Sequence, residues 1–225
     1  MTSTIHSAVC SRQLGRLSGS AMLSELNLAY VDLETTGARA ADDRITEIAV
    51  VTVRGGNELA WESLVQPHCE VPRFIQQLTG IDAALLAGAP DFERLAEDLL
   101  RRLEGAVLVA HNARFDAGFL RAAFTRCGLH YRPKRLCTLK LARALYPDWP
   151  RHGLDALCMM IGYHREQSHR AMADVRAMMV FVEYAVADLG EDRVFSEISI
   201  QMSRGGGGSK RRVAGPELSP SRSKS

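Results

Sequence analysis

The 225-residue sequence predicts an α/β fold in which a mixed sheet is flanked by helices. Two observations lead to this prediction. Three apolar runs near the start of the chain are typical of strands, and from about residue 91 apolar residues recur at helical spacing around one further short strand. An antiparallel start followed by βα units indicates a mixed sheet with helices on its faces. With 46% hydrophobic residues, the chain is long enough for one packed domain with tails.

The first part of the chain is expected to be a three-stranded antiparallel unit. Its strands are predicted at residues 28–33, 45–53 and 59–65. The turn between the second and third strands is predicted at "RGGN", residues 54–57, because two glycines allow a tight reversal. Short helices are then expected at residues 74–78 and 83–87.

The second part is expected to be helical around one strand. Phe92, Leu95, Leu99 and Leu103 recur at helical spacing and predict a helix over residues 91–103. The apolar run "VLVA" that follows Gly105 predicts a short strand. The remaining helices are expected at residues 115–126, 139–145, 154–161 and 171–189.

The two ends differ in composition from the body, which is expected to be one domain at residues 26–192. Residues 1–25, rich in Ser and Thr, are expected to be a disordered extension; a transit peptide has such a composition, but an early start codon with Met22 as the true beginning is preferred. Residues 193–225 contain "GGGGS" followed by an end that is rich in Ser, Pro and basic residues. A flexible basic tail is therefore expected there.

Composition excludes several classes of protein. No apolar run approaches the roughly 18 residues of a membrane span. The five cysteines form no C-x-x-C pair, which argues against a disulfide framework and against a zinc knuckle and fits a reducing cytoplasm. The body is mildly acidic, so overall charge does not indicate nucleic-acid binding, although residues 126–151 carry seven basic residues against one acidic residue.

The run "YVDLETTG" at residues 30–37 places two acidic residues on one strand. Asp32 and Glu34 point to the same face because strand side chains alternate. Two carboxylates side by side in a buried strand repel each other unless a cation or a proton lies between them. Solvated loop residues at a strand end are the alternative from this run alone.

Two further acids follow at comparable places. Asp116 ends "AHNARFD", just past the second short strand, and Asp174 ends "HRAMAD", at the start of the last predicted helix. Strand ends and helix starts converge at one edge of an α/β sheet, so the four acids can meet in one pocket. Oxygen ligands alone suit Mg²⁺ or Mn²⁺ rather than zinc.

Three motifs in this order resemble the DEDDh (DnaQ-like) 3'-5' exonuclease family. They are D-x-E-T-T-G at residues 32–37, H-N-A-x-F-D at residues 111–116 and H-x-A-x-x-D at residues 169–174. Weaker similarities are "RITEIAVV", "LTGID" and "HGLDALC". Within the family, the nearest resemblance is to the epsilon proofreading subunit of bacterial DNA polymerase III and its free-standing relatives. The resemblance covers roughly residues 26–190 and implies a ribonuclease H-like five-stranded sheet.

The resemblance also implies roles for individual residues. Metal ligands are expected at Asp32, which would bridge two Mg²⁺ or Mn²⁺ ions, and at Glu34, Asp116 and Asp174. His169 is the expected general base, because its near-neutral pKa suits proton transfer from water. Contacts to the terminal nucleotide are expected from Thr35, Thr36, Gly37, Ile81, His111, Asn112 and Phe115, and a core role for Phe115 is an open alternative.

The function expected from this resemblance is metal-dependent release of nucleoside 5'-monophosphates from DNA 3' ends, single-stranded or frayed, in proofreading or repair. RNA trimming of the oligoribonuclease type is the alternative; "DLETTG" rather than "DLEMTG" favours DNA. A non-catalytic nucleic-acid-binding module is a third reading, but it would need a broken motif. A DNA polymerase subunit is a possible partner, while "ISIQMSRGGGG" is only a weak match to a clamp-binding peptide.

Overall fold

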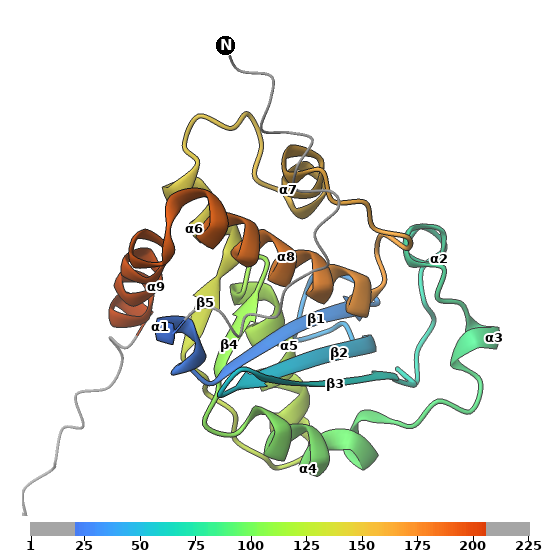
Figure 1. Cartoon of the computed structure of the whole chain (residues 1–225). Helices are drawn as coiled ribbons and strands as arrows, with labels where there is room; N and C mark the ends of the chain where they lie inside the picture. Colours follow the sequence, from blue (N-terminus) through green and yellow to red (C-terminus); the bar gives the residue numbers. More distant parts are fainter. Residues whose placement is uncertain (1–20, 206–225) are drawn as a thin grey trace, which may run out of the picture.

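The computed structural model describes residues 21–205 and contains the expected mixed five-stranded sheet flanked by helices (Figure 1). The strand order is β3-β2-β1-β4-β5, with β1, β2 and β3 antiparallel and with β4 and β5 parallel to β1. The strands are β1 (Leu28–Thr35), β2 (Ile45–Arg54), β3 (Asn57–Leu64), β4 (Val107–Ala110) and β5 (Arg135–Cys137). β5 is the strand for which no sequence range was predicted.

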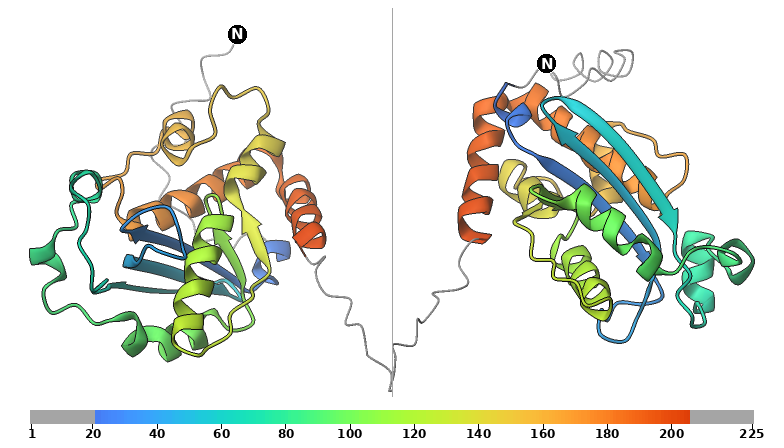
Figure 2. Two further views of the ribbon diagram at one scale, coloured as in Figure 1. Left: turned by 180° about the vertical axis from the view of Figure 1, so that it is seen from behind. Right: turned by 90° about the horizontal axis from the view of Figure 1, so that it is seen from below.

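Helices cover both faces of this sheet (Figures 1 and 2). One face packs against α4 and α5, and the other packs against α6, α7, α8 and α9. In Figure 1, α8 crosses in front of the sheet and α5 lies behind it. The helices are α1 (Ala21–Ser24), α2 (Arg73–Thr79), α3 (Ala83–Leu86), α4 (Phe92–Leu103), α5 (Arg114–Arg126), α6 (Thr138–Leu145), α7 (Leu154–Ile161), α8 (Ala171–Leu189) and α9 (Glu191–Gly205).

The central strand β1 contributes side chains both to the hydrophobic core and to the acidic site. Tyr30 is fully buried in the core beneath α8, whereas Val31 and Leu33 are buried in the core that faces α5. Alternation therefore turns Asp32 and Glu34 to the α8 face. β4 pairs with β1 only as far as Tyr30, so the half of β1 that carries the two acids extends past the end of β4.

The C-terminal part of the described chain differs from the expected flexible tail. Residues 193–205 belong to α9, in which Val194 and Ile198 are fully buried against the core of the α8 face. The Gln201 side-chain oxygen accepts a hydrogen bond of 3.1 Å from the Cys137 backbone N–H of the edge strand β5. Apolar residues four apart thus give a short stripe that packs on the sheet, although Ser and Gln surround them.

The N-terminal boundary also differs in detail. Residues 21–24 form α1, and Leu23 is buried in the same core as α9. The Glu191 carboxylate accepts hydrogen bonds from the backbone N–H groups of Met22 and Leu23, at 2.5 and 3.2 Å. Most of the expected extension and the basic end with its "GGGGS" run lie outside the described residues. Between residues 21 and 205, the helices are too short or too polar to cross a bilayer.

Candidate active site

Three carboxylates from two elements meet at the end of the sheet. Oxygen atoms of Asp32, Glu34 and Asp174 all lie within 4.8 Å of one another. Asp174 is in the first turn of α8, where its N–H donates to the Arg170 carbonyl at 3.1 Å. The sequence motifs at residues 32–37 and 169–174 are therefore brought together by packing α8 across β1.

The fourth predicted acid, Asp116, lies in the first turn of α5 and is only 2% exposed. It is not one of the three acids whose oxygens cluster within 4.8 Å. Among the charges around Asp32, however, that of Asp116 has the largest effect on its pKa. Asp116, at the start of α5, therefore acts on the three-acid group through its charge.

Burial raises the pKa of each of these acids, and repulsion from the other acids raises the pKa of Asp32 and Glu34 further. The pKa of Asp32 is well above its usual range, chiefly because of burial. Burial, followed by the charges of Asp174 and Glu47, raises the pKa of Glu34 to about 8, and burial raises that of Asp116 to about 7. The pKa of Asp174 is also raised by burial. Four acids with this behaviour need protons or cations to offset their charge at neutral pH.

Arg165 supplies one such positive charge. Its side chain is 4% exposed and forms ion pairs with Asp174 and with Asp155 at the start of α7. The Asp155 side chain is 68% exposed, so the ion pair between Arg165 and Asp174 is the buried one of the two. Arg165 opposes the rise in the pKa of Asp174 that burial causes.

His169 immediately precedes the N-cap of α8. Its backbone has φ of +60°, a left-handed conformation that is uncommon for a residue other than glycine, and its side chain is half-buried. A positive charge at His169 would act to lower the pKa of Asp174. The predicted base and the predicted metal ligand of the third motif thus both stand at the start of α8.

His111 and Asn112 follow β4 directly. His111 Nδ1 lies 3.0 Å from the Thr138 hydroxyl, while its Nε2 is buried without a hydrogen-bond partner among the described residues. Burial lowers the pKa of His111 to about 4, so the ring is neutral at neutral pH. Asn112 adopts φ of +70°, and its carbonyl accepts the Phe115 N–H at 2.8 Å, which closes the turn into α5 and so sets the position of Asp116.

The loop after β1 is held by its own hydrogen bonds. The Thr35 hydroxyl donates to the Gly37 carbonyl at 2.6 Å, and the Thr36 hydroxyl accepts from the Arg44 N–H at 3.0 Å. A Cβ at Gly37 would lie 2.6 Å from the carboxyl group of Asp43, so any larger residue there would push that side chain aside. These contacts fix the turn beside the acids but engage the hydroxyl groups that were expected to reach a nucleotide.

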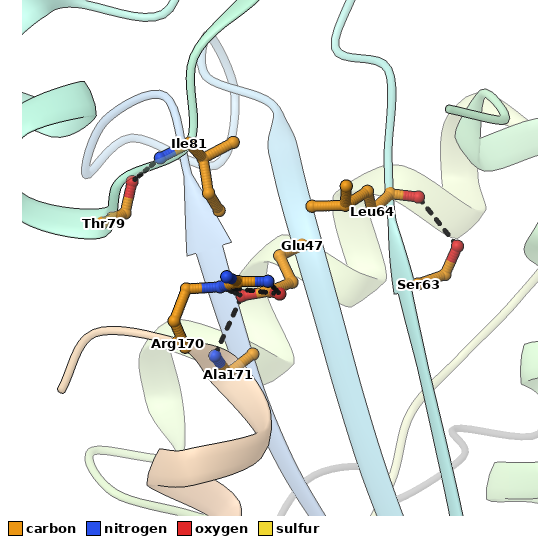
Figure 3. Close-up of polar contacts among 7 residues, drawn as sticks. All are labelled: Glu47, Ser63, Leu64, Thr79, Ile81, Arg170 and Ala171. Carbon is orange, nitrogen blue, oxygen red and sulfur yellow. Dashed lines mark hydrogen bonds and ion pairs between the residues drawn. The ribbon is translucent and has the colours of Figure 1, made fainter. Parts of the chain in front are cut away.

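Two predicted nucleotide contacts are packed inside the protein. Ile81 is fully buried in a small cluster under α2 and α3, and its N–H donates to the Thr79 hydroxyl at 3.1 Å (Figure 3). Contact between Ile81 and a base would require this cluster to open. Phe115 is half-buried and packs against Phe119, with ring centroids 4.7 Å apart, in the core beneath α5.

Three charged residues of the site were not predicted from the sequence: Glu47, Arg165 and Arg170. The Glu47 side chain on β2 is 4% exposed, lies opposite Glu34 in the sheet and pairs with Arg170 (Figure 3). Arg165 pairs with Asp174. Glu47 stands inside the apolar run "RITEIAVV", and a charge inside an otherwise apolar strand is a signal for a buried partner. The arginines lie in a loop and at its junction with α8, where the sequence has no periodic pattern.

The donor set fits a hard divalent cation. It consists of carboxylate oxygens, it is partly buried, and the pKa values of Asp32 and Glu34 are raised by burial first and then by the crowding of like charges. Carboxylates that remain close together in this way are typical of sites for Mg²⁺ or similar ions. No cysteine or histidine belongs to the cluster of potential ligands found among residues 21–205.

A family model described as exonuclease matches residues 30–181. In Staphylococcus saprophyticus, a protein named 3'-5' exonuclease DinG is 36% identical over 148 residues, which are 65% of this chain and 16% of that protein. In Mycobacterium tuberculosis, a protein named as a putative bifunctional exonuclease/endonuclease is 37% identical over 182 residues, 76% of this chain and 28% of that protein.

A third relative is a PolC-type DNA polymerase III of Bacillus subtilis, 35% identical over 173 residues, 76% of this chain and 12% of that protein. The chain therefore spans less than a third of the length of each of these relatives. Among solved structures, E. coli Exonuclease I in complex with a dT13 oligonucleotide has a TM-score of 0.67 at 20% identity, over 76% of this chain and 43% of that one. This similarity confirms the fold.

Proposed function

This chain belongs to the exonuclease family, and from that premise we propose that it hydrolyses the terminal phosphodiester at DNA 3' ends and releases nucleoside 5'-monophosphates. The observation that carries the proposal is the meeting of Asp32, Glu34 and Asp174 within 4.8 Å, with Asp116 beside them. Relatives named 3'-5' exonuclease and DNA polymerase III support the same reaction.

We infer that the acids hold Mg²⁺ or Mn²⁺, two ions per site, with Asp32, Glu34, Asp116 and Asp174 as ligands. When bound, such ions supply positive charge to the phosphate oxygens and lower the pKa of water. The carboxylates then need no protons at neutral pH, because the cations offset the repulsion that raises their pKa values. The protein's part is to fix the four side chains from β1, α5 and α8.

His169 is proposed to accept the proton of the attacking water. The residue is half-buried and immediately precedes the N-cap of α8, whose first turn carries Asp174, which is the place a base for this reaction would take. His111, neutral and with an unpartnered Nε2 in the described structure, is proposed to contact the terminal nucleotide. The turn at Thr35–Gly37 and Asn112 would approach the same nucleotide through the backbone.

DNA is the proposed substrate, preferably single-stranded or frayed. Solved structures of the similarly folded E. coli Exonuclease I contain dT13 and dA16 oligonucleotides, which supports DNA as the substrate. RNA is the competing substrate. A DNA polymerase subunit is proposed as a partner on the basis of the PolC-type relatives, and a cytoplasmic location fits the unpaired Cys69, Cys127, Cys137 and Cys158.

The test is Mg²⁺-dependent digestion of 5'-labelled single-stranded DNA and of RNA of the same sequence, by wild type and Asp32→Ala. Shortening of DNA from the 3' end by the wild type alone, with RNA degraded more slowly, supports the proposal. Degradation of RNA alone would reassign the substrate. No cleavage of either would leave a binding module.

A further inference from the structure

An ion pair between a buried carboxylate and a partly exposed arginine joins the edge of the site to the sheet. Glu47 on β2 accepts hydrogen bonds from Arg170 Nε, at 3.0 and 3.2 Å, and from Arg170 Nη2, at 2.6 Å (Figure 3). The Ala171 N–H donates to the same carboxylate at 2.9 Å. The Arg170 guanidinium thus contacts both oxygens of Glu47, and the Ala171 backbone N–H contacts one of them.

The carboxylate caps the helix from another element. Arg170 is the N-cap of α8 and makes no side-chain cap hydrogen bond of its own. The first N–H groups of a helix need an acceptor, and a negative charge at that end is favourable. Glu47 meets both requirements, and it fixes the start of α8 relative to β2 and therefore relative to its neighbour β1.

The residues on either side of this anchor are those of the proposed chemistry. His169 directly precedes Arg170 and is held in a left-handed conformation. Asp174 follows within one turn, with its N–H donating to the Arg170 carbonyl at 3.1 Å. Glu47 also lies opposite Glu34 in the β1–β2 register, so the anchor and the β1 acids share one part of the sheet.

Charge also argues for the pair. Glu47 alone would add a fifth carboxylate to a site that already crowds four, since it lies opposite Glu34 in the sheet. Its ion pair with Arg170 offsets that charge and holds the guanidinium at the start of α8.

We propose that Glu47 and Arg170 are positioning residues for the exonuclease reaction, which place His169 and Asp174 against the acids of β1. The inference rests on the proposed function. It gives Arg170 a role through its neighbours rather than through contact with the substrate. A small displacement of groups that must align with the reacting atoms lowers the rate far more than it lowers binding.

The test compares Arg170→Gln with Arg176→Gln. Arg176, also on α8, pairs with Glu58 on β3 at 2.8 Å, so its loss removes a helix-to-sheet ion pair away from the start of the helix. We expect kcat for 5'-labelled DNA to fall about tenfold to a hundredfold in Arg170→Gln with KM within about twofold, and both constants to stay within about twofold in Arg176→Gln. Arg170→Lys, which keeps the charge but loses the fork, should lie between wild type and Arg170→Gln.

A double-variant cycle separates positioning from a general loss of structure. In His169→Ala, assayed at raised enzyme concentration, adding Arg170→Gln should lower the rate by a smaller factor than it does in the wild type, because one of the two groups being positioned is gone. An equal loss in both backgrounds, or Arg170→Gln at wild-type rate, would overturn the inference. If Arg170→Gln does not fold, Glu47→Gln, which keeps an acceptor for the Ala171 N–H, replaces it. Failure of the wild type itself to digest DNA would instead refute the proposed function.

Discussion

Asp32 on β1 and Asp174 in the first turn of α8 have carboxylate oxygens within 4.8 Å of each other. Burial raises the pKa of both acids, and the charge of Asp174 further raises the pKa of Asp32 and of Glu34. The folded protein therefore places like charges together where the unfolded chain would separate them. A bound divalent cation removes that repulsion, which links stability, pH and metal in a way that can be measured.

Without metal, the protein should become less stable as the pH rises from 6.5 to 8. The folded pKa of Glu34 is about 8 and that of Asp116 about 7, both above their ordinary values, so the folded state binds more protons than the unfolded state in this window. Stability contributed by those protons is lost as the pH passes through the folded pKa values. Below pH 6.5 the lowered pKa of His111 acts in the opposite direction, which is why the window starts there.

Urea unfolding in EDTA and in Mg²⁺ at pH 6.5 and 8 measures this effect. Mg²⁺ should stabilise the protein more at pH 8 than at pH 6.5. Glu183, whose pKa is raised to about 7 chiefly by burial, contributes to the slope from outside the acid cluster. Glu183→Gln should therefore flatten the EDTA slope and keep the Mg²⁺ response, whereas Glu34→Gln should weaken both. Constant stability of the wild type in EDTA across this range would contradict the prediction.

Arg165 should matter most when metal is absent. Arg165→Gln leaves the buried Asp174 without its ion-pair partner, and breaking a buried pair costs about 3 kcal/mol. Asp155→Asn removes only the 68% exposed partner and should cost no more than about 1 kcal/mol. Unfolding in EDTA at pH 7.5 gives both values. The gain in melting temperature on adding Mg²⁺ should be larger in Arg165→Gln than in wild type, and an equal or smaller gain would count against a cation beside Asp174.

Substitution of His169 should lower kcat alone, whereas substitution of Asp116 should lower both kcat and the stabilisation by Mg²⁺. His169→Asn should lower kcat by about a hundredfold or more, as loss of a general base does, while Mg²⁺ stabilises the variant as it does the wild type. Asp116→Asn should lower both kcat and the stabilisation by Mg²⁺, because a ligand is lost. Single-turnover digestion and thermal melting with Mg²⁺ on the same samples test the difference. Loss of the Mg²⁺ response in His169→Asn would assign that residue to metal binding instead.

Helix α9 should be part of the folded unit. Ile198 is fully buried, and Ile198→Ala is expected to lower the free energy of unfolding by about 3 kcal/mol. Ile200 on the same helix is 37% exposed, so Ile200→Ala should change it by less than about 1 kcal/mol. Chemical denaturation compares the two. Equal, small effects would show that this segment does not contribute to stability and would favour the flexible tail expected from composition.

The sequence predicts the sheet better than it predicts the surroundings of the acids. Strands such as Val107–Ala110 are uniform apolar runs, so their place in a buried sheet follows from local pattern. The three-residue strand β5 is too short to give a pattern, and α9 buries only a narrow stripe, with Val194 and Ile198 fully buried.

The acids themselves were identified from motifs, but their partners depend on tertiary packing. Arg170 meets Glu47 only after α8 is laid across the sheet, and Arg165 meets Asp174 only once the loop before α8 folds back on the helix. No periodic pattern in the chain indicates either contact. Ile81 shows the reverse case, because a residue expected at the nucleotide is fully buried in a local cluster. Side-chain partners across elements are thus the part that required the structure.

The direction of digestion tests the central claim most directly. Single-stranded DNA labelled at the 5' end in one sample and at the 3' end in another is incubated with wild type or with Asp32→Asn, in Mg²⁺ and in EDTA. The account predicts that the wild type with Mg²⁺ releases the 3' label at once as a nucleoside monophosphate and shortens the 5'-labelled strand stepwise, and that the variant and the EDTA samples do neither. Early release of the 5' label, or cleavage that survives Asp32→Asn, would contradict it.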